Sequence, residues 1–167
     1  IVTSSIGVIG AGVMGSGIAQ TLATAGHPTV CTDVSEEALS LAQEQVRKGR
    51  YGFERAVERG KLEKEAAEAA YGRLRFTNSL EEAANCDLVV ECVPERLDLK
   101  LRLFRDIDAL APDGTILASN SSGFPIAALQ AVTDRPDQVI GWHWASPPVI
   151  MRFAEIVVTE QTSPETI

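Results

Sequence analysis

The sequence predicts an α/β fold in which helices cover both faces of a doubly wound, mostly parallel sheet. Three observations lead to this prediction. Short apolar segments alternate with helical patterns along the 167 residues, as they do in chains of βαβ units. The apolar segments are hydrophobic on both faces, which is typical of strands covered by helices on both sides. The first segment ends at a glycine-rich turn that opens a helix, as the first βα turn of such a sheet does.

The first two strands and their helices have clear boundaries in the sequence. Residues 5–9 form a short apolar run that stops at glycine, as a buried strand does. A helical pattern follows from residue 15 to about residue 25, where "GHP" breaks it, and residues 29–33 give the second strand. Ser35 is a suitable N-cap for the next helix, which runs to about Lys48. Two glutamates lie in its first turn, where the helix dipole favours them.

The middle of the chain is more charged. The segment 51–74 is predicted to be helical, because it contains no strand pattern. Residues 75–77 are a candidate short strand. Ser79 and Glu82 have the spacing of a capping box, which predicts a short helix after them. The run "DLVVECV" at residues 87–93 predicts a strongly buried strand.

A helix is predicted from Asp98 to Leu110, because four apolar residues recur on one of its faces. They are Leu99, Leu103, Ile107 and Leu110. A strand, a short helix and two final strands follow, at residues 115–119, 125–129, 138–143 and 153–159. The segment 162–165 has the pattern of a helix start close to the last residue. Because the chain also begins with isoleucine rather than methionine, we expect the natural protein to be longer.

Composition narrows the classes of function. With 45% hydrophobic residues, the chain can form the core of one globular domain, which we assign to residues 1–167. A net charge of −8 argues against a nucleic acid partner. No apolar run approaches the roughly 18 residues of a membrane span, and no secretory signal is visible. The spacing of the three cysteines, Cys31, Cys86 and Cys92, predicts no metal site, and we interpret them as reduced thiols of a cytoplasmic protein.

The glycine-rich turn matches the dinucleotide-binding fingerprint of Rossmann-type domains. Gly10, Gly12 and Gly15 have G-x-G-x-x-G spacing between the first strand and the first helix. In that order they allow the tight turn, the approach of the backbone to a pyrophosphate, and close packing of helix on strand. The N–H groups of the helix start favour phosphate, so we include Val13 and Met14 in the cofactor-binding set. The alternative is a strand–helix turn without a ligand.

An acidic residue selects the cofactor. Asp33 ends the second strand, 18 positions after Gly15 (33 minus 15). A carboxylate at this place accepts hydrogen bonds from the ribose 2′-hydroxyl of NAD and repels the 2′-phosphate of NADP. The next residues, Val34 and Ser35, offer no arginine for that phosphate. We therefore predict NAD. FAD uses the same kind of loop, so the chemistry depends on the remaining site residues.

Three polar residues follow or end the late strands. Ser122 lies after the strand at 115–119, His143 ends the next strand, and Glu155 lies in the last one. Ligands of open parallel sheets bind at the carboxyl ends of the strands, so these side chains are expected to converge. Oxidation of an alcohol by hydride transfer also needs a base for the hydroxyl proton, and histidine suits that role near neutral pH. The alternative is a structural histidine.

Four stretches resemble the nucleotide-binding domain of the L-3-hydroxyacyl-CoA dehydrogenases, in order and over nearly the whole chain. They are "IGVIGAGVMGSGIAQTLATAGHPTVCTD", "DLVVECVPERLDLK", "SNSSGFPI" and "GWHWASPP…FAEIV". The resemblance is weakest between residues 49 and 75. It implies that His143 is the general base and that Glu155, twelve positions later (155 minus 143), pairs with it. His27 matches only the turn before the second strand, and we interpret it as structural.

The resemblance implies further properties. Ser122 is expected to bind the substrate oxygen, Asn120 to lie near the nicotinamide, and Glu95 and Lys100 to approach the cofactor. The implied reaction is the NAD-dependent oxidation of an L-3-hydroxyacyl-CoA to the 3-ketoacyl-CoA, in fatty-acid β-oxidation or hydroxybutyryl-CoA metabolism. A helical C-terminal domain that forms a homodimer is expected downstream. Three basic residues are candidates for contacts with CoA phosphates or for a solvated helix face: Arg47, Lys48 and Arg50.

Two departures from the family's pattern concern the substrate. Ser146 stands where asparagine usually precedes the first proline, and Gly123 replaces a serine. Both positions surround the expected acyl site, so Ser146 belongs to the candidate substrate-binding residues. A dehydrogenase of a CoA-free 3-hydroxy acid, such as L-gulonate or carnitine, is therefore one alternative. A dinucleotide-binding module without catalysis is the other. Trp142 and Trp144 either shape the pocket or belong to the core.

Overall fold

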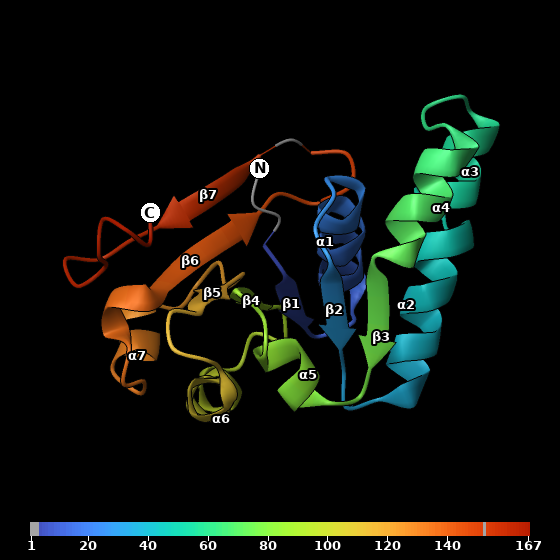
Figure 1. Cartoon of the computed structure of the whole chain (residues 1–167). Coiled ribbons are helices and arrows are strands. Elements are labelled where there is room, and N and C mark those ends of the chain that lie inside the picture. The colour runs from blue at the N-terminus through green and yellow to red at the C-terminus, as the bar shows by residue number, and fades with distance from the viewer. Residues whose placement is uncertain (1–3, 152) are drawn as a thin grey trace.

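Seven strands form one sheet in the order β3-β2-β1-β4-β5-β6-β7 (Figure 1). The computed structural model describes residues 4–151 and 153–167. The strands are β1 (Ile6–Ile9), β2 (Thr29–Thr32), β3 (Leu74–Thr77), β4 (Leu88–Glu91), β5 (Ile116–Ser119), β6 (Val139–Trp144) and β7 (Ala154–Val157). All neighbouring pairs are parallel except β6 and β7. The order reverses between β1 and β4, which creates a switch point at the carboxyl ends of these strands.

Helices cover both faces of the sheet, so the predicted fold class is confirmed (Figure 1). They are α1 (Val13–Thr24), α2 (Glu36–Lys48), α3 (Phe53–Glu58), α4 (Lys64–Gly72), α5 (Leu80–Ala84), α6 (Leu97–Leu110) and α7 (Ile126–Gln130), with a 3₁₀ turn at Pro136–Gln138. One core cluster joins Val8 and Val90 to α1 and α2. A second joins Ile9 and Val89 to α5, α6 and α7. Successive strand residues thus enter opposite layers, as the pleat requires.

The charged segment after α2 differs in part from its prediction. Instead of one helical stretch over 51–74, α3 ends at Glu58 and α4 begins at Lys64. Gly60 lies between them with φ of 64°, a left-handed conformation that ends a helix. The predicted short strand is confirmed as β3, which takes in Leu74. Together α2, α3 and α4 form a helical projection at the β3 edge (Figure 1), with its own small core around Phe53.

Two helix starts use the predicted caps, but one capping box is only half formed. Ser35 Oγ accepts a hydrogen bond from the N–H three residues later, at 3.2 Å. Ser79 Oγ does the same for Glu82 N, at 3.2 Å. The Glu82 carboxylate does not accept a hydrogen bond from Ser79 N, because it binds the side chains of Arg75 and Thr77 on β3. The predicted helix start at residues 162–165 forms a turn.

The predicted buried face of α6 is wrong in part. The buried residues of this helix are Lys100, Phe104 and Ile107, whereas Leu110 is exposed. The apolar pattern pointed to the leucines, but the face that meets the sheet begins with a lysine. Lys100 is tolerated there because it forms an ion pair with Glu91 at the end of β4.

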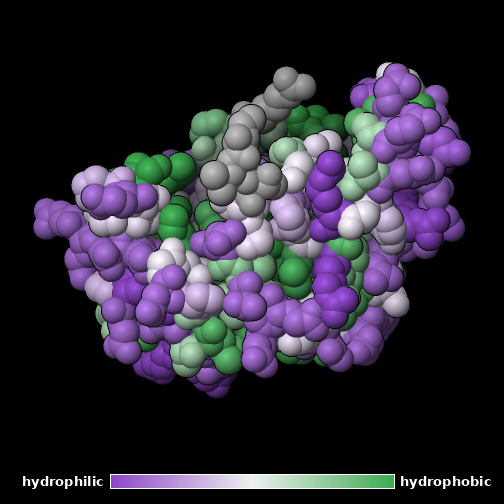
Figure 2. Space-filling model, viewed as in Figure 1, coloured by the Kyte–Doolittle hydropathy of each residue, from purple (hydrophilic) through white to green (hydrophobic). Residues whose placement is uncertain are grey.

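Hydropathy differs between the two ends of the sheet. Hydrophilic residues cover α3 and α4, whereas hydrophobic residues reach the surface near β7 (Figure 2). Six large apolar side chains are exposed on β7 and beside it: Ile150, Met151, Phe153, Ile156, Val157 and Val158. Within residues 4–151 and 153–167, no helix combines the length and the apolar character that a membrane span requires.

Arg135 forms several hydrogen bonds with the C-terminal end of α6 and the residues that follow it. Its Nε donates to Asp108 Oδ1 at 2.6 Å, and its other nitrogens donate to the carbonyl oxygens of Asp108, Ala111 and Pro112 at 2.7–3.1 Å. The Arg135 and Asp108 side chains are only 13% and 11% exposed. Removing the guanidinium therefore leaves a nearly buried carboxylate and three carbonyls short of donors.

We expect Arg135→Met to lower the free energy of unfolding by about 3 kcal/mol, measured by urea denaturation. Arg102→Met is the matched control. Arg102 and Asp98 form an exposed ion pair on α6, so the loss of this pair is expected to lower the free energy of unfolding by less than about 0.5 kcal/mol. Equal losses for the two variants would show that Arg135 does not secure the helix end.

Candidate active site

The glycine-rich loop lies between β1 and α1 at the switch point of the sheet. Gly10 has φ of 104°, which favours glycine, and a Cβ there would lie 2.7 Å from the Cys92 carbonyl oxygen. A Cβ on Gly15 would lie 1.7 Å from the Gly10 carbonyl oxygen. These two glycines are therefore required by the protein's own packing. A Cβ on Gly12 would meet nothing within 4 Å, so this position is left open toward a ligand.

Asp33 connects the loop to the end of β2. Its Oδ2 accepts a hydrogen bond from Ala11 N and its Oδ1 accepts one from Ser35 N, each at 2.9 Å. Every carboxylate oxygen has a second lone pair, which remains for a ribose hydroxyl. The next side chain, Val34, is 98% exposed and supplies no positive charge. This arrangement fits NAD better than its 2′-phosphorylated form.

One cavity of about 460 Å³ brings together seven of the residues singled out in the sequence. They are Met14, Glu95, Lys100, Asn120, Ser122, His143 and Ser146. The cavity lies where the α1 start, the loop after β4 and the ends of β5 and β6 meet. Gly12 and Val13 line a neighbouring cavity of about 510 Å³ between α1, α2 and the turn at 147–149. These nine candidates thus lie at the carboxyl ends of the strands, as a parallel sheet requires, whereas Gly10, Gly15, Asp33 and Glu155 line neither cavity.

His143 and Glu155 face each other across the last two strands. They are register partners in the antiparallel β6–β7 pair, and His143 Nδ1 lies 3.6 Å from Glu155 Oε2. This distance suits an ion pair with a protonated imidazole but is longer than a hydrogen bond. Because β7 is antiparallel, a residue near its start lies beside the end of β6. The contact engages Nδ1 and leaves Nε2 as the nitrogen available to a substrate.

Both tryptophans support this edge of the sheet. Trp142 and Trp144 pack against each other, with ring centroids 4.9 Å apart, and against the α1-side core. Trp144 also lines the 460 Å³ cavity, and its backbone N–H donates to Asn120 Oδ1 at 2.9 Å. Trp144 therefore belongs to the core and to the pocket.

Pro148 covers Gly17 of α1, where a Cβ would meet the proline ring at 3.3 Å.

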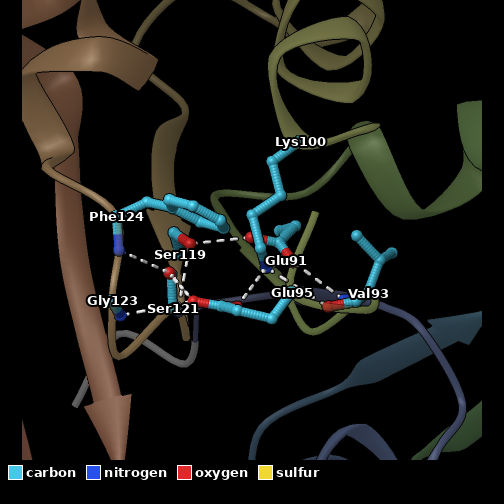
Figure 3. Close-up of polar contacts among 8 residues, drawn as sticks. All are labelled: Glu91, Val93, Glu95, Lys100, Ser119, Ser121, Gly123 and Phe124. Atoms are coloured by element: carbon cyan, nitrogen blue, oxygen red, sulfur yellow. Dashed lines mark hydrogen bonds and ion pairs between the residues drawn. The ribbon is translucent and has the colours of Figure 1, made fainter. Parts of the chain in front are cut away.

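Three residues near the cavity escaped the sequence analysis. Glu91, Ser119 and Ser121 are buried and join the loops after β4 and β5 by hydrogen bonds (Figure 3). Glu91 did carry a signal, since a carboxylate at the end of an apolar strand needs a buried partner. That partner, Lys100, was noted only as a cofactor contact. Its ammonium is held by Glu91 and Glu95, and its side chain is 1% exposed.

The cysteines are free thiols, as the sequence indicated. Burial, with a smaller contribution from Asp33, raises the pKa of the Cys31 thiol to about 12. Burial raises the pKa of Cys92 well above its usual value, and Glu91 adds to this. The described part of the chain holds no group of three or more potential metal ligands.

The fold and the loop define a class of protein: a Rossmann-type dinucleotide-binding domain, with an acid placed for the ribose of NAD. The family model described as "3-hydroxyacyl-CoA dehydrogenase, NAD binding domain" matches residues 5–167. The chain belongs to this family, so the suspected resemblance is confirmed and the cofactor is NAD.

Individual relatives agree with this assignment. The chain is 39% identical over 159 residues to a probable 3-hydroxybutyryl-CoA dehydrogenase of Bacillus subtilis, covering 95% of this chain and 54% of that protein. It is 41% identical over 160 residues to a protein of the same name from Deinococcus radiodurans, covering 96% and 56%. The crystal structure of 3-hydroxybutyryl-CoA dehydrogenase from Escherichia coli aligns with a TM-score of 0.94 at 34% identity, covering 99% of this chain and 34% of that one. The chain thus spans about half the length of these two curated relatives.

Proposed function

We propose that the full-length protein oxidises an L-3-hydroxyacyl-CoA to the 3-ketoacyl-CoA, with NAD as the hydride acceptor. The observation that carries this proposal is the convergence of His143, Ser122 and Asn120 on one cavity next to the glycine-rich loop. Relatives named 3-hydroxybutyryl-CoA dehydrogenase support the substrate class. When bound, NAD supplies the acceptor for the hydride that leaves C3 of the substrate.

The site residues have distinct proposed roles. His143 takes the hydroxyl proton through Nε2, and Glu155 faces Nδ1 and stabilises the imidazolium that forms. Ser122 donates a hydrogen bond to the substrate oxygen. The Asn120 carbonyl is already engaged by Trp144 N, so its amide N–H groups remain for the cofactor or the substrate. Gly12, whose Cβ space is open, lets the loop backbone approach the pyrophosphate.

We further propose that the 510 Å³ cavity receives part of the acyl-CoA. Its lining includes apolar residues of α1 and α2 together with Arg50. Of the three basic candidates, Arg47 and Lys48 form ion pairs with Glu54 and Glu44. Arg50 stacks over the Tyr51 ring instead, 5.4 Å from its centroid. Arg50 is therefore our candidate for a phosphate contact, and Ser146 for a contact near the acyl group.

The relatives' greater length supports a proposal about assembly. Exposed apolar residues on β7, such as Phe153 and Ile156, offer a surface for a further domain of the full-length protein. We propose that this domain is helical and forms the homodimer contact. The free, high-pKa thiols agree with a cytoplasmic protein, which is our proposal for its location.

The test is NADH oxidation by the full-length protein with acetoacetyl-CoA as substrate. We expect turnover on the order of 10 s⁻¹, with acetoacetate as the CoA-free comparison. NADH binding without turnover of acetoacetyl-CoA would contradict the proposed substrate. Turnover of a 3-hydroxy acid without CoA would then favour the CoA-free alternative and make Ser146 the first residue to replace.

A further inference from the structure

Five residues beside the cavity form a closed ring of polar contacts, in which Ser121 takes part through both its backbone N–H and its hydroxyl (Figure 3). The ring runs from Lys100 to Glu91, Ser119, Ser121 and Glu95 and back to Lys100. Its members come from four places: the end of β4, the loop after β4, the first half of α6, and the end of β5 with its loop. The ring therefore joins β4, β5 and α6 at the carboxyl ends of the two strands.

Glu91 satisfies both of its oxygens inside the protein. Its side chain is 0% exposed. Oε1 accepts from Val93 N at 2.8 Å and from the Lys100 ammonium, and Oε2 accepts from Ser119 Oγ at 2.7 Å. A buried carboxylate with this many donors is held in one position.

Lys100 has three polar partners within the ring and its loop. It donates hydrogen bonds to Glu91 and to the Val93 carbonyl, the latter at 3.2 Å. It also forms an ion pair with Glu95 Oε2, at 3.3 Å. Although Lys100 borders the cavity, its contacts place it behind Glu95. Its ion pair with Glu95 holds that carboxylate at the cavity wall.

The other side of the ring holds the loop after β5. Ser121 N donates to Ser119 Oγ at 3.1 Å, and Ser121 Oγ binds Glu95. Glu95 also accepts from Gly123 N, at 3.2 Å. The held positions alternate with Asn120 and Ser122, the two residues of this loop that line the cavity.

Glu95 is the most exposed member of the ring and remains ionised. Partial burial raises its pKa, but the hydrogen bond from Ser121, the charge of Lys100 and the bond from Gly123 outweigh burial, so its pKa lies below the usual value. Two carboxylates face one ammonium, so the ring keeps a net negative charge at the cavity wall.

We propose that Glu91 is a positioning residue for the proposed reaction, because the ring that it closes through Lys100 and Ser119 sets the places of Ser122, Asn120 and the Glu95 carboxylate. This inference rests on the proposed function. A role in stability alone would not require this location, since a buried ion pair contributes little net stability compared with apolar residues of similar volume. Small displacements of a catalytic group, in contrast, cost up to about 10²-fold in rate.

The sharpest test compares two variants of the full-length protein, each of which lacks one hydroxyl at one end of β5. Ser119→Ala opens the ring. Thr115→Val removes an equally buried hydroxyl, which donates to the Cys86 carbonyl at 2.8 Å. We expect similar shifts in the urea midpoint for both. Only Ser119→Ala should lower kcat, by about 10-fold, while the Kd for NADH stays within about twofold.

A second pair of variants separates geometry from charge. Glu91→Gln keeps the size of the side chain but leaves the Lys100 charge to Glu95 alone, and we expect kcat to fall by about 10²-fold. Adding Lys100→Gln replaces the buried ion pair by two hydrogen-bonding amides, leaves the single negative charge of Glu95, and should recover part of that loss. If Glu91→Gln is too unstable to purify, Ser119→Ala still decides the matter.

The outcomes distinguish this inference from the proposed function. If the unaltered protein turns over its substrate and Ser119→Ala matches it in kcat, the ring is structural and the proposal is wrong. If the unaltered protein shows no turnover, the proposed function fails, and the emission of bound NADH decides the inference. The inference then predicts that the fluorescence emission of bound NADH changes in Ser119→Ala and stays the same in Thr115→Val. Equal emission from NADH bound to the two variants would overturn the inference.

Discussion

Replacing His143 with glutamine is expected to reduce turnover of the full-length protein by about 10²–10⁴-fold. Glutamine has a similar reach and hydrogen-bonding capacity, but it cannot accept the substrate proton. Because the substituted side chain lies at the end of β6 and makes no buried hydrogen bond with Glu155, the fold and the Kd for NADH should change little. Steady-state kinetics and NADH fluorescence titration measure the two effects separately.

The chain offers a matched control for this variant in its other histidine. His27 lies before β2, away from the cavity, and its Nδ1 contacts the Ser4 carbonyl at 3.1 Å. His27→Gln should therefore leave kcat unchanged. If His143→Gln retains turnover comparable to that of His27→Gln, the proton is taken by another group and the role proposed for His143 is wrong.

Gly12→Ala is expected to weaken NADH binding by about 10²-fold without loss of stability. The added Cβ meets no protein atom within 4 Å, and φ of −71° with ψ of −169° is open to alanine. The only demand for glycine at this position is then the approach of the pyrophosphate to the backbone. Fluorescence titration with NADH and urea denaturation of the same variant measure affinity and stability.

Gly72→Ala is the matched control for Gly12→Ala. A Cβ on Gly72 would also meet nothing within 4 Å, but this glycine lies at the end of α4, far along the chain from the loop. We expect its NADH affinity to be unchanged. Normal affinity in Gly12→Ala would show that the cofactor does not approach the loop at this residue.

The order of elements could be predicted because local signals agree with the fold. Apolar runs, glycine breaks and the Ser35 cap mark β1, β2 and α2 within a few residues. The sequence was less informative where contacts between distant residues determine the end of a helix or its buried face. The break between α3 and α4 depends on a left-handed glycine, Gly60, inside a charged helical pattern. The buried face of α6 depends on a carboxylate from β4.

The candidate site was found largely because it lies at strand ends. Asp33, Ser122 and His143 each follow or end an apolar run, and parallel strands bring such residues to one edge. The ring around Glu91 could not be predicted in this way. Its members are separated by up to 30 positions (121 minus 91), and hydrogen bonds among them exist only once β4, β5 and α6 have packed.

The reversed direction of β7 separates the His143–Glu155 pair from the loop that carries Ser146. The His143–Glu155 geometry is set by the ladder between β6 and β7, which closes above it with a hydrogen bond from Ala145 N to the Phe153 carbonyl at 3.1 Å. Residues 146–151 lie in the loop that follows β6, and surface loops tolerate substitution and insertion. If Ser146 contacts the substrate as proposed, substitutions in this loop can change substrate preference while His143 and Glu155 keep their register.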